Sequence, residues 1–191
     1  MKKMLIAIAV VPFLLGFCAP SYAVTTGNLN FLVGGKALEK DDWEPLEDQT
    51  AVSFHLDVTP EGWPVALAFD VLASGAEEEN YANSGFDLKA STIEYDFGVR
   101  KFFGDETDVA GFIGGGLGFI GAEAEVTFGG ATASEDDSAL GFWIDAGIQG
   151  RFFEAMNLGL DFRYSQAEVN VGGVDVEAGG FTTGVYIGYG W

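Results

Sequence analysis

The sequence of 191 residues has one cysteine, one histidine, five prolines and nine basic residues against 29 acidic ones. The shortage of lysine and arginine gives a formal net charge of -20, which excludes the basic surface that proteins use to bind nucleic-acid phosphates. The only cysteine, Cys18, lies in a predicted export signal, so the exported chain can form no disulfide. Beyond that signal no apolar run is long enough for a membrane-spanning helix. A membrane protein of this sequence would therefore have to be a β-barrel.

The N-terminus has the pattern of a cleaved export signal. Lys2 and Lys3 precede an apolar run over 4–17, and Ser21 and Ala23 occupy the -3 and -1 positions of a signal-peptidase site. The run has about 14 residues, fewer than the roughly 20 of a spanning helix, which disfavours a membrane anchor. Phe17 before Cys18 disfavours a lipoprotein, because a lipobox has a small residue there. We expect 1–23 to be a signal peptide and 24–191 to be one exported domain.

Glycine, aromatic residues and period-two alternation are abundant instead. The chain has 28 glycines and 17 phenylalanines, and its mean hydropathy is +0.20. One face of the alternating segments is apolar and aromatic, whereas the other carries charges of both signs, as in a barrel with lipid outside and a polar lumen. We therefore predict an all-β protein, an eight-stranded antiparallel up-and-down transmembrane β-barrel. The alternation predicts strands at 27–38, 50–58, 65–74, 89–103, 109–128, 139–152, 158–171 and 181–191.

Two of these strands are less regular than the others. The facing of the glycine-rich fifth strand is ambiguous before Ile120, and Val169 and Val171 change parity within the seventh. The links between strands alternate between long (39–49, 75–88, 129–138, 172–180) and short (59–64, 104–108, 153–157), as in barrels with long outer loops and short periplasmic turns. An aromatic girdle is predicted at the short-turn end, formed by Trp63, Phe103, Phe112, Phe152, Phe153, Tyr189 and Trp191.

The C-terminal segment 184–191 carries a recognisable pattern. It alternates apolar residues and ends on an aromatic one, with Gly184, Tyr186, Tyr189 and Trp191 as its signal positions. This pattern resembles the terminal signal read by the barrel-assembly machinery, and the eight-strand layout resembles the small barrels of the OmpA, OmpX and OmpW type. The resemblance implies a Gram-negative outer membrane, with outer-membrane lipid, lipopolysaccharide and the assembly machinery as partners. It also implies a structural or surface-interaction role.

Charged residues on the polar face are expected to fill the lumen. An eight-stranded barrel is only wide enough for its own side chains, so these charges indicate an internal ion-pair network more than a pore. A narrow channel or porin-like transport of small molecules is the alternative function. The predicted network consists of Lys36, Asp70, Glu94, Asp96, Arg100, Asp145, Arg151, Asp161 and Arg163.

Two motifs resemble catalytic or cofactor sites. The GxGxxG string at 116–121 lies within a strand with no helix after it, so it predicts close packing and not a dinucleotide site. Ser53, His55 and Asp57 share one strand face, but residues two apart lie about 6.5–7 Å from each other, too far for direct hydrogen bonds. A lumenal polar cluster is favoured, and a lipid A acyl-transfer or deacylase activity is the second alternative. No catalytic residue, cofactor or metal ligand is predicted.

The four long loops hold 15 of the 29 acidic residues, including Asp41, Asp42, 77–79 and 135–137. They predict a solvated, repulsive surface, with divalent-cation binding beside lipopolysaccharide phosphates as the alternative. No loop has the D-x-[DN]-x-[DN]-G order of a calcium loop. We therefore predict a structural or surface-interaction function through these extracellular loops, with a partner that the sequence does not identify.

Overall fold

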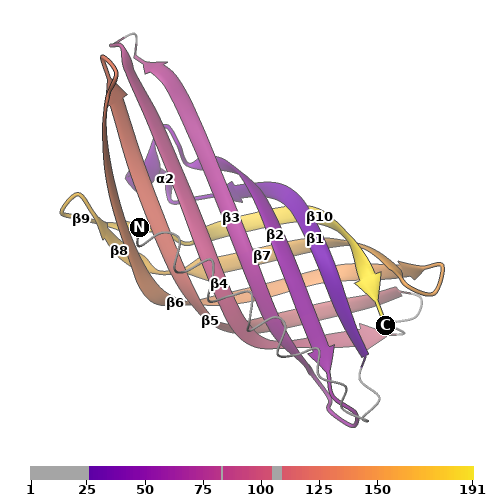
Figure 1. Cartoon of the computed structure of the whole chain (residues 1–191). Helices are drawn as coiled ribbons and strands as arrows, with labels where there is room; N and C mark the ends of the chain where they lie inside the picture. Colours follow the sequence, from indigo (N-terminus) through magenta and orange to yellow (C-terminus); the bar gives the residue numbers. More distant parts are fainter. Residues whose placement is uncertain (1–25, 83, 105–108) are drawn as a thin grey trace.

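The computed structural model describes residues 26–82, 84–104 and 109–191, so the predicted signal peptide 1–23 and most of the predicted short link 104–108 lie outside the described residues. Eight antiparallel strands form a closed barrel in the order β1-β10-β7-β6-β5-β4-β3-β2 (Figure 1). The first and last barrel strands pair from Asn28↔Gly190 to Ala37↔Phe181 and close the ring. The predicted fold class is confirmed. The strands are β1 (Thr26–Ala37), β2 (Asp48–Thr59), β3 (Ala66–Tyr81), β4 (Phe86–Gly104), β5 (Val109–Phe128), β6 (Ala131–Phe152), β7 (Met156–Gln166) and β10 (Gly180–Gly190).

The two faces of the barrel wall differ as the alternation requires. Phe54, Ile144 and Phe162 are each about half exposed on the outer face, as are similar side chains around the whole ring. The inner face carries the buried polar residues. In β5, Ile113 and Leu117 point outward, which resolves the facing of that strand before Ile120. No helix among the described residues is long and apolar enough to cross a membrane.

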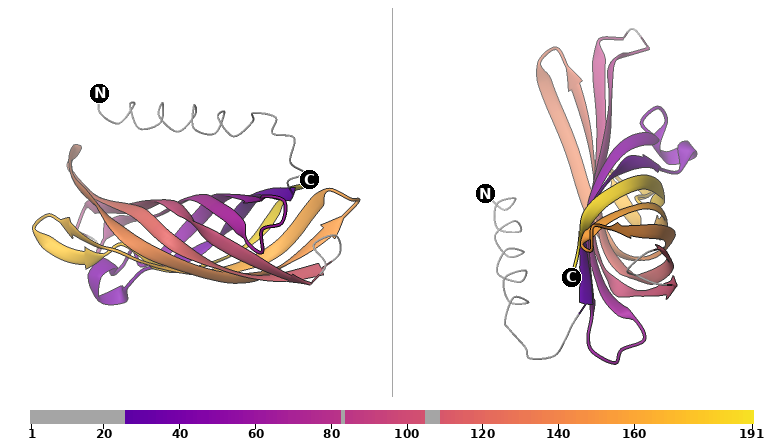
Figure 2. Two further views of the ribbon diagram at one scale, coloured as in Figure 1. Left: turned by 90° about the horizontal axis from the view of Figure 1, so that it is seen from below. Right: turned by 90° about the vertical axis from the view of Figure 1, so that its right-hand side faces the viewer.

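Two hairpins are longer than the sequence pattern predicted. The expected links 75–88 and 129–138 are mostly strand, because β3–β4 and β5–β6 continue well past the barrel (Figures 1 and 2). In β4 the outward side chains change from Ile93 to Lys89, while the inward ones change from Glu94 to Ala90. The strands therefore exchange their polar and apolar faces as they leave the barrel. Because the sequence pattern assumes an apolar outer face, it predicts strands that end at this exchange.

The predicted strand 158–171 is also corrected. β7 ends at Gln166, and β8 (Glu168–Val171) pairs with β9 (Val174–Glu177) in a separate hairpin. The parity change at Val169 marks this break. The hairpin and the short helix α2 (Lys40–Trp43) lie at the end of the barrel opposite the C-terminus, the long-loop end (Figure 2).

Candidate functional site

Arg100 on β4 points into the barrel and is 2% exposed. Its guanidinium donates to Asp57 at 2.6 Å, to Asp70 at 2.9 Å and to Asp145 at 2.5 Å. These acceptors come from β2, β3 and β6, so this one side chain links β4 to three other strands across the lumen. Each hydrogen bond is charge-assisted, which is the stronger class.

Arg163 on β7 is equally buried and extends this centre. It donates to Asp96 at 2.7 Å and to Asp70, and it lies 3.7 Å from Asp145. Asp70 and Asp145 therefore bridge both arginines. Trp143, fully buried on β6, lies beneath the Arg163 guanidinium, whose Cζ is 4.6 Å from the ring centroid. This cation–π contact adds to the ion pairs.

Inward glycines make room for these large groups. A Cβ on Gly98 would lie 2.8 Å from the Trp143 ring, and one on Gly118 would collide with the Asp96 carboxylate. Gly116 faces the same way, and its Cβ would meet the Phe97 carbonyl oxygen. The GxGxxG string is thus a packing feature of β5, in agreement with the structural interpretation of that motif.

A second polar layer lies between this centre and the long-loop end. Lys36 is 1% exposed and its Nζ donates to Glu94 at 2.6 Å, to Thr92 at 2.9 Å and to the Ala178 carbonyl at 3.0 Å. Ser165 donates to the same Glu94 oxygen at 2.9 Å. Lys36 therefore joins the barrel wall to the segment that follows β9.

The short-turn end of the lumen is filled differently. Phe112 is 4% exposed and packs inside with Leu32, Tyr186 and Phe102, so its predicted place in an outer girdle is wrong. The glycine-rich neighbours of Phe112 hid its facing in the sequence. Below this layer Arg151, which is half-buried, donates to Asn157 at 3.0 Å and to Asn28 at 2.6 Å.

Arg151 therefore contacts amide oxygens, and among the described residues no carboxylate pairs with it. The prediction that Arg151 belongs to the ion-pair network is therefore wrong. In the C-terminal segment, Gly184 and Tyr186 face the lumen, whereas Tyr189 and Trp191 are exposed on the outer face with stacked rings 6.4 Å apart. The Trp191 backbone exchanges two hydrogen bonds of 3.0 Å with Gly27.

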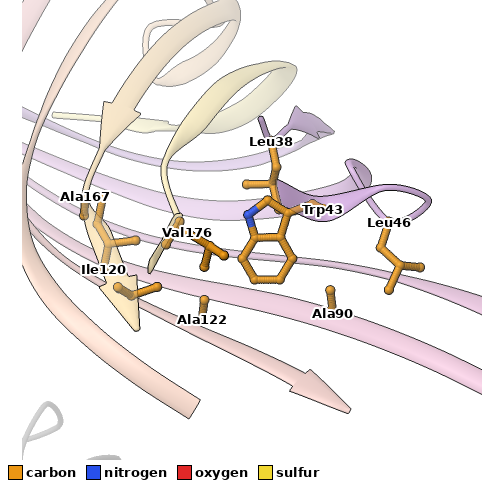
Figure 3. Close-up of a cluster of buried hydrophobic side chains, with 10 residues drawn as sticks. Leu38, Trp43, Leu46, Ala90, Ile120, Ala122, Ala167 and Val176 are labelled. Atoms are coloured by element: carbon orange, nitrogen blue, oxygen red, sulfur yellow. The ribbon is translucent and has the colours of Figure 1, made fainter. Parts of the chain in front are cut away.

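An apolar cap lies above the charged layers at the long-loop end. We define this cap as the buried cluster contributed by the first long loop, the β8–β9 segment and the inner faces of β4 and β5 (Figure 3). Its central ring is Trp43, which is 7% exposed and donates from Nε1 to the Glu177 carbonyl at 2.7 Å. The cap consists of Leu38, Trp43, Leu46, Ala90, Ile120, Ala122, Ala167, Val169, Val176 and Ala178.

Polar contacts join the segments of the cap to each other and to the extended strand β6. Asp42 accepts from the Glu177 backbone N–H at 2.8 Å, which joins the α2 segment to β9. Asp137 on β6 accepts from the Asn170 backbone N–H at 2.8 Å, and this bond lowers the pKa of the exposed Asp137 carboxyl below its usual value. The alternation did not predict the cap, because the segments that cover the inner faces of β4 and β5 come from a loop and from the parity change around Val169.

The Ser53, His55 and Asp57 group does not form a triad. Ser53 donates to the Val71 carbonyl at 3.0 Å, and Asp57 is engaged by Arg100. His55 Nδ1 lies 3.5 Å from Asp161, which is another of the predicted network residues. The described residues also contain no group of three or more His, Cys, Asp or Glu arranged to hold a metal ion. The pattern fits a lumenal polar cluster.

Buried acids outnumber buried bases in the described interior. The fully buried lysine and arginine side chains of the described residues are Lys36, Arg100 and Arg163. Asp57 is a network member that the predicted set left out. Its position on the polar face of β2 was visible in the alternation, but its partner was not. The six buried carboxylates are Asp57, Asp70, Glu94, Asp96, Asp145 and Asp161.

No protein-family model matches the sequence, and no curated protein does. Solved structures match over most of the chain. Ail, the attachment invasion locus protein of Yersinia pestis, in complex with a heparin analogue, is 12% identical with a TM-score of 0.63, over 87% of this chain and 99% of that one. Neisserial surface protein A is 14% identical with a TM-score of 0.55, over 89% and 98% of the two chains.

The outer membrane protein OprG from Pseudomonas aeruginosa is 10% identical with a TM-score of 0.54, over 87% of this chain and 94% of that one. At such identities the likeness is one of fold. It confirms that the chain has the eight-stranded architecture of small outer-membrane β-barrels, as the sequence resemblance implied.

Proposed function

We propose that this chain is an outer-membrane barrel with a closed lumen, whose working surface is the long-loop end. The observation that carries the proposal is the filling of the interior by successive layers. Lys36 and its partners lie directly beneath the apolar cap, and the two arginines lie beneath Lys36. If the side chains of one layer were removed, the other layers would still block the lumen. A role at the surface therefore fits better than passage of solutes.

The long-loop end is the natural extracellular surface. Short turns face the periplasm in barrels of this kind, and longer segments project outside the cell. The two extended hairpins carry many of the exposed acidic residues, including Glu77, Glu79 and Asp136. Ail has been solved with a heparin analogue, which is a polyanion. With a net charge of -20, this chain is better suited to cationic partners.

Two measurements test the proposal. The protein should fractionate with the outer membrane and migrate faster on gels before heating than after it, because a closed barrel resists detergent unfolding. In planar bilayers it should give no unitary current steps. A soluble periplasmic protein would contradict the location, and sustained current steps would contradict the closed lumen.

A narrow cation channel is the second candidate. The observation that favours it is the excess of buried carboxylates over buried bases, since a lumen of that charge would attract cations. If current steps are seen, they should be cation-selective, and Asp145→Asn should reduce that selectivity. Anion-selective steps would exclude this candidate. The His55-based enzyme gains no support, because Ser53 and Asp57 are engaged elsewhere.

A further inference from the structure

The extended hairpins carry an apolar strip that the cap does not cover. The four strands β3–β6 continue beyond the barrel, and their inner face continues the lumen face. Ala90 and Ala122 at the base of this face are buried under the cap. Farther out, Val126 and Phe128 are 41% and 54% exposed. The described residues leave this upper part of the face open to solvent.

At its tip the strip has an aromatic row, which we define as the three rings of Tyr81, Phe86 and Phe128. They lie in one register line across β3, β4 and β5, and Ala131 continues this line on β6. Phe86 and Phe128 stack with centroids 4.5 Å apart and an interplanar angle of 25°. Tyr81 and Phe86 are 41% and 38% exposed. Exposed aromatic rings that stack on a β-sheet are typical anchors of protein interfaces.

A β-bulge places Tyr81 in this row. The register between β3 and β4 shifts between Glu78 and Tyr81, and Asn80 has a φ of 52°. Without the shift, Asn80 would stand opposite Phe86. Bulges commonly re-aim a side chain in this way. The Asn80 backbone N–H donates to Asp87 at 2.9 Å, and its side chain accepts from the Gly85 N–H at 2.9 Å, so these two hydrogen bonds join the bulged end of β3 to the start of β4.

Carboxylates flank the apolar strip on both sides. Glu78 on β3 stands opposite Leu88, and Glu135 on β6 stands opposite Ala124, and both acids are exposed. The described residues of this face include no basic side chain near the two acids. Lys89 points to the opposite face, where it is in register with Glu77. The face is therefore apolar at its centre and negative at its two edges.

We propose that this face binds a cationic amphipathic peptide segment, with its apolar side on the aromatic row and its basic side chains on Glu78 and Glu135. Along β4, Phe86 at the tip lies four residues beyond Ala90 in the cap, a length of about 14 Å at ~3.4 Å per residue. An amphipathic helix of about ten residues has a matching length of ~15 Å. The inference rests on the proposed function, because it names the partner class of that same surface.

The test uses the full barrel in phosphatidylcholine nanodiscs, with empty nanodiscs as the blank. The probe is a fluorescent peptide of about 12 residues with leucine and one tryptophan on one helical face and lysine on the other, read by anisotropy at ~0.15 M salt. The wild-type protein should bind it and should not bind the same peptide with glutamate in place of lysine. Preference for the glutamate peptide would overturn the proposal.

Matched variants separate this face from the general negative charge. Glu78→Gln with Glu135→Gln should weaken binding about fivefold or more, whereas Glu77→Gln with Glu125→Gln, which removes the same charge from the opposite face, should change it less than about twofold. Equal weakening by the two pairs would mean unspecific attraction and would overturn the proposal.

Phe86→Ser with Phe128→Ser should weaken binding by about tenfold. Retained heat-dependent gel mobility checks that each variant is folded. Unchanged affinity would contradict the aromatic anchor, and a wild-type dimer that these substitutions dissociate would assign the face to a second copy instead. A barrel that reaches the outer membrane, carries no current and binds no peptide would overturn this inference and leave the proposed function standing.

Discussion

Replacing Arg100 tests whether the interior is held together as the contacts indicate. In Arg100→Ala, Asp57 loses the only ion-pair partner that it has among the described residues, whereas Asp70 and Asp145 keep Arg163. Breaking a buried pair by removing one member costs about 3–5 kcal/mol, because the remaining charge stays buried and uncompensated. We expect a loss of that size in the free energy of unfolding.

Three further variants show where the loss comes from. Arg151→Ala should cost less than Arg100→Ala, because Arg151 is half-buried and its acceptors among the described residues are amide oxygens. Lys89→Ala on the exposed outer face should cost about 0–1 kcal/mol. Adding Asp57→Asn to Arg100→Ala should recover part of the stability, since the stranded carboxylate is then neutral, and the coupling follows from a double-mutant cycle.

Urea unfolding in lipid vesicles, followed by tryptophan fluorescence, measures these differences at constant temperature and pH. The order Arg100, Arg151, Lys89 is the expected one. Equal midpoints for Arg100→Ala and Lys89→Ala at the same slope would refute the internal network. The absence of any recovery on adding Asp57→Asn would refute the specific partner.

Gly118→Ala should lower the urea midpoint of unfolding, because its Cβ would disturb the Asp96 carboxylate. Gly111→Ala should be tolerated, because its Cβ would meet nothing closer than 3.8 Å, and paired urea titrations compare the two variants. Trp43→Ala should raise the rate of amide hydrogen exchange in the β8–β9 hairpin. It should produce no current in bilayers, because the charged layers remain beneath the cap. New current steps would show that the cap alone closes the lumen. Deleting Trp191 or changing it to Asp should lower the amount of assembled barrel in outer-membrane immunoblots, whereas Trp191→Phe should leave this amount nearly unchanged. A wild-type amount of the Asp variant would contradict a role of Trp191 in assembly.

The fold could be predicted because lipid and a narrow lumen impose opposite demands on neighbouring residues. The alternation of Phe97 and Asp96 in β4 is sufficient to assign their faces. The pairing inside the lumen could not be predicted in the same way. Arg100 and Asp145 are 45 residues apart, and their contact depends on the register of three strands and on the rotamers of both side chains. Alternation determines which residues face inward but not which of them meet.

The cap was hidden for a different reason. Trp43 and Val176 come from segments with no sustained periodicity, and both are buried in a cluster that joins these segments to β4 and β5. Phe112 was misplaced because glycines on both sides of it give no alternation to read. In each case the missing information is tertiary, since short loop segments have no local preference strong enough to indicate their burial.

The exchange of faces along β4 connects the membrane and the surface parts of the molecule. Outward side chains are apolar from Ile93 to Val99 and polar at Ser91 and Lys101 on either side. From Ser91 to Lys101 an extended strand covers about 34 Å, and a tilt of ~40° reduces this to about 26 Å, close to the ~25 Å apolar band of such barrels. In the proposed outer-membrane setting, water contacts both faces beyond Ser91, so the apolar inner face there has no lipid to cover it. The cap covers its lower part, and the upper part is the face for which we propose a peptide partner.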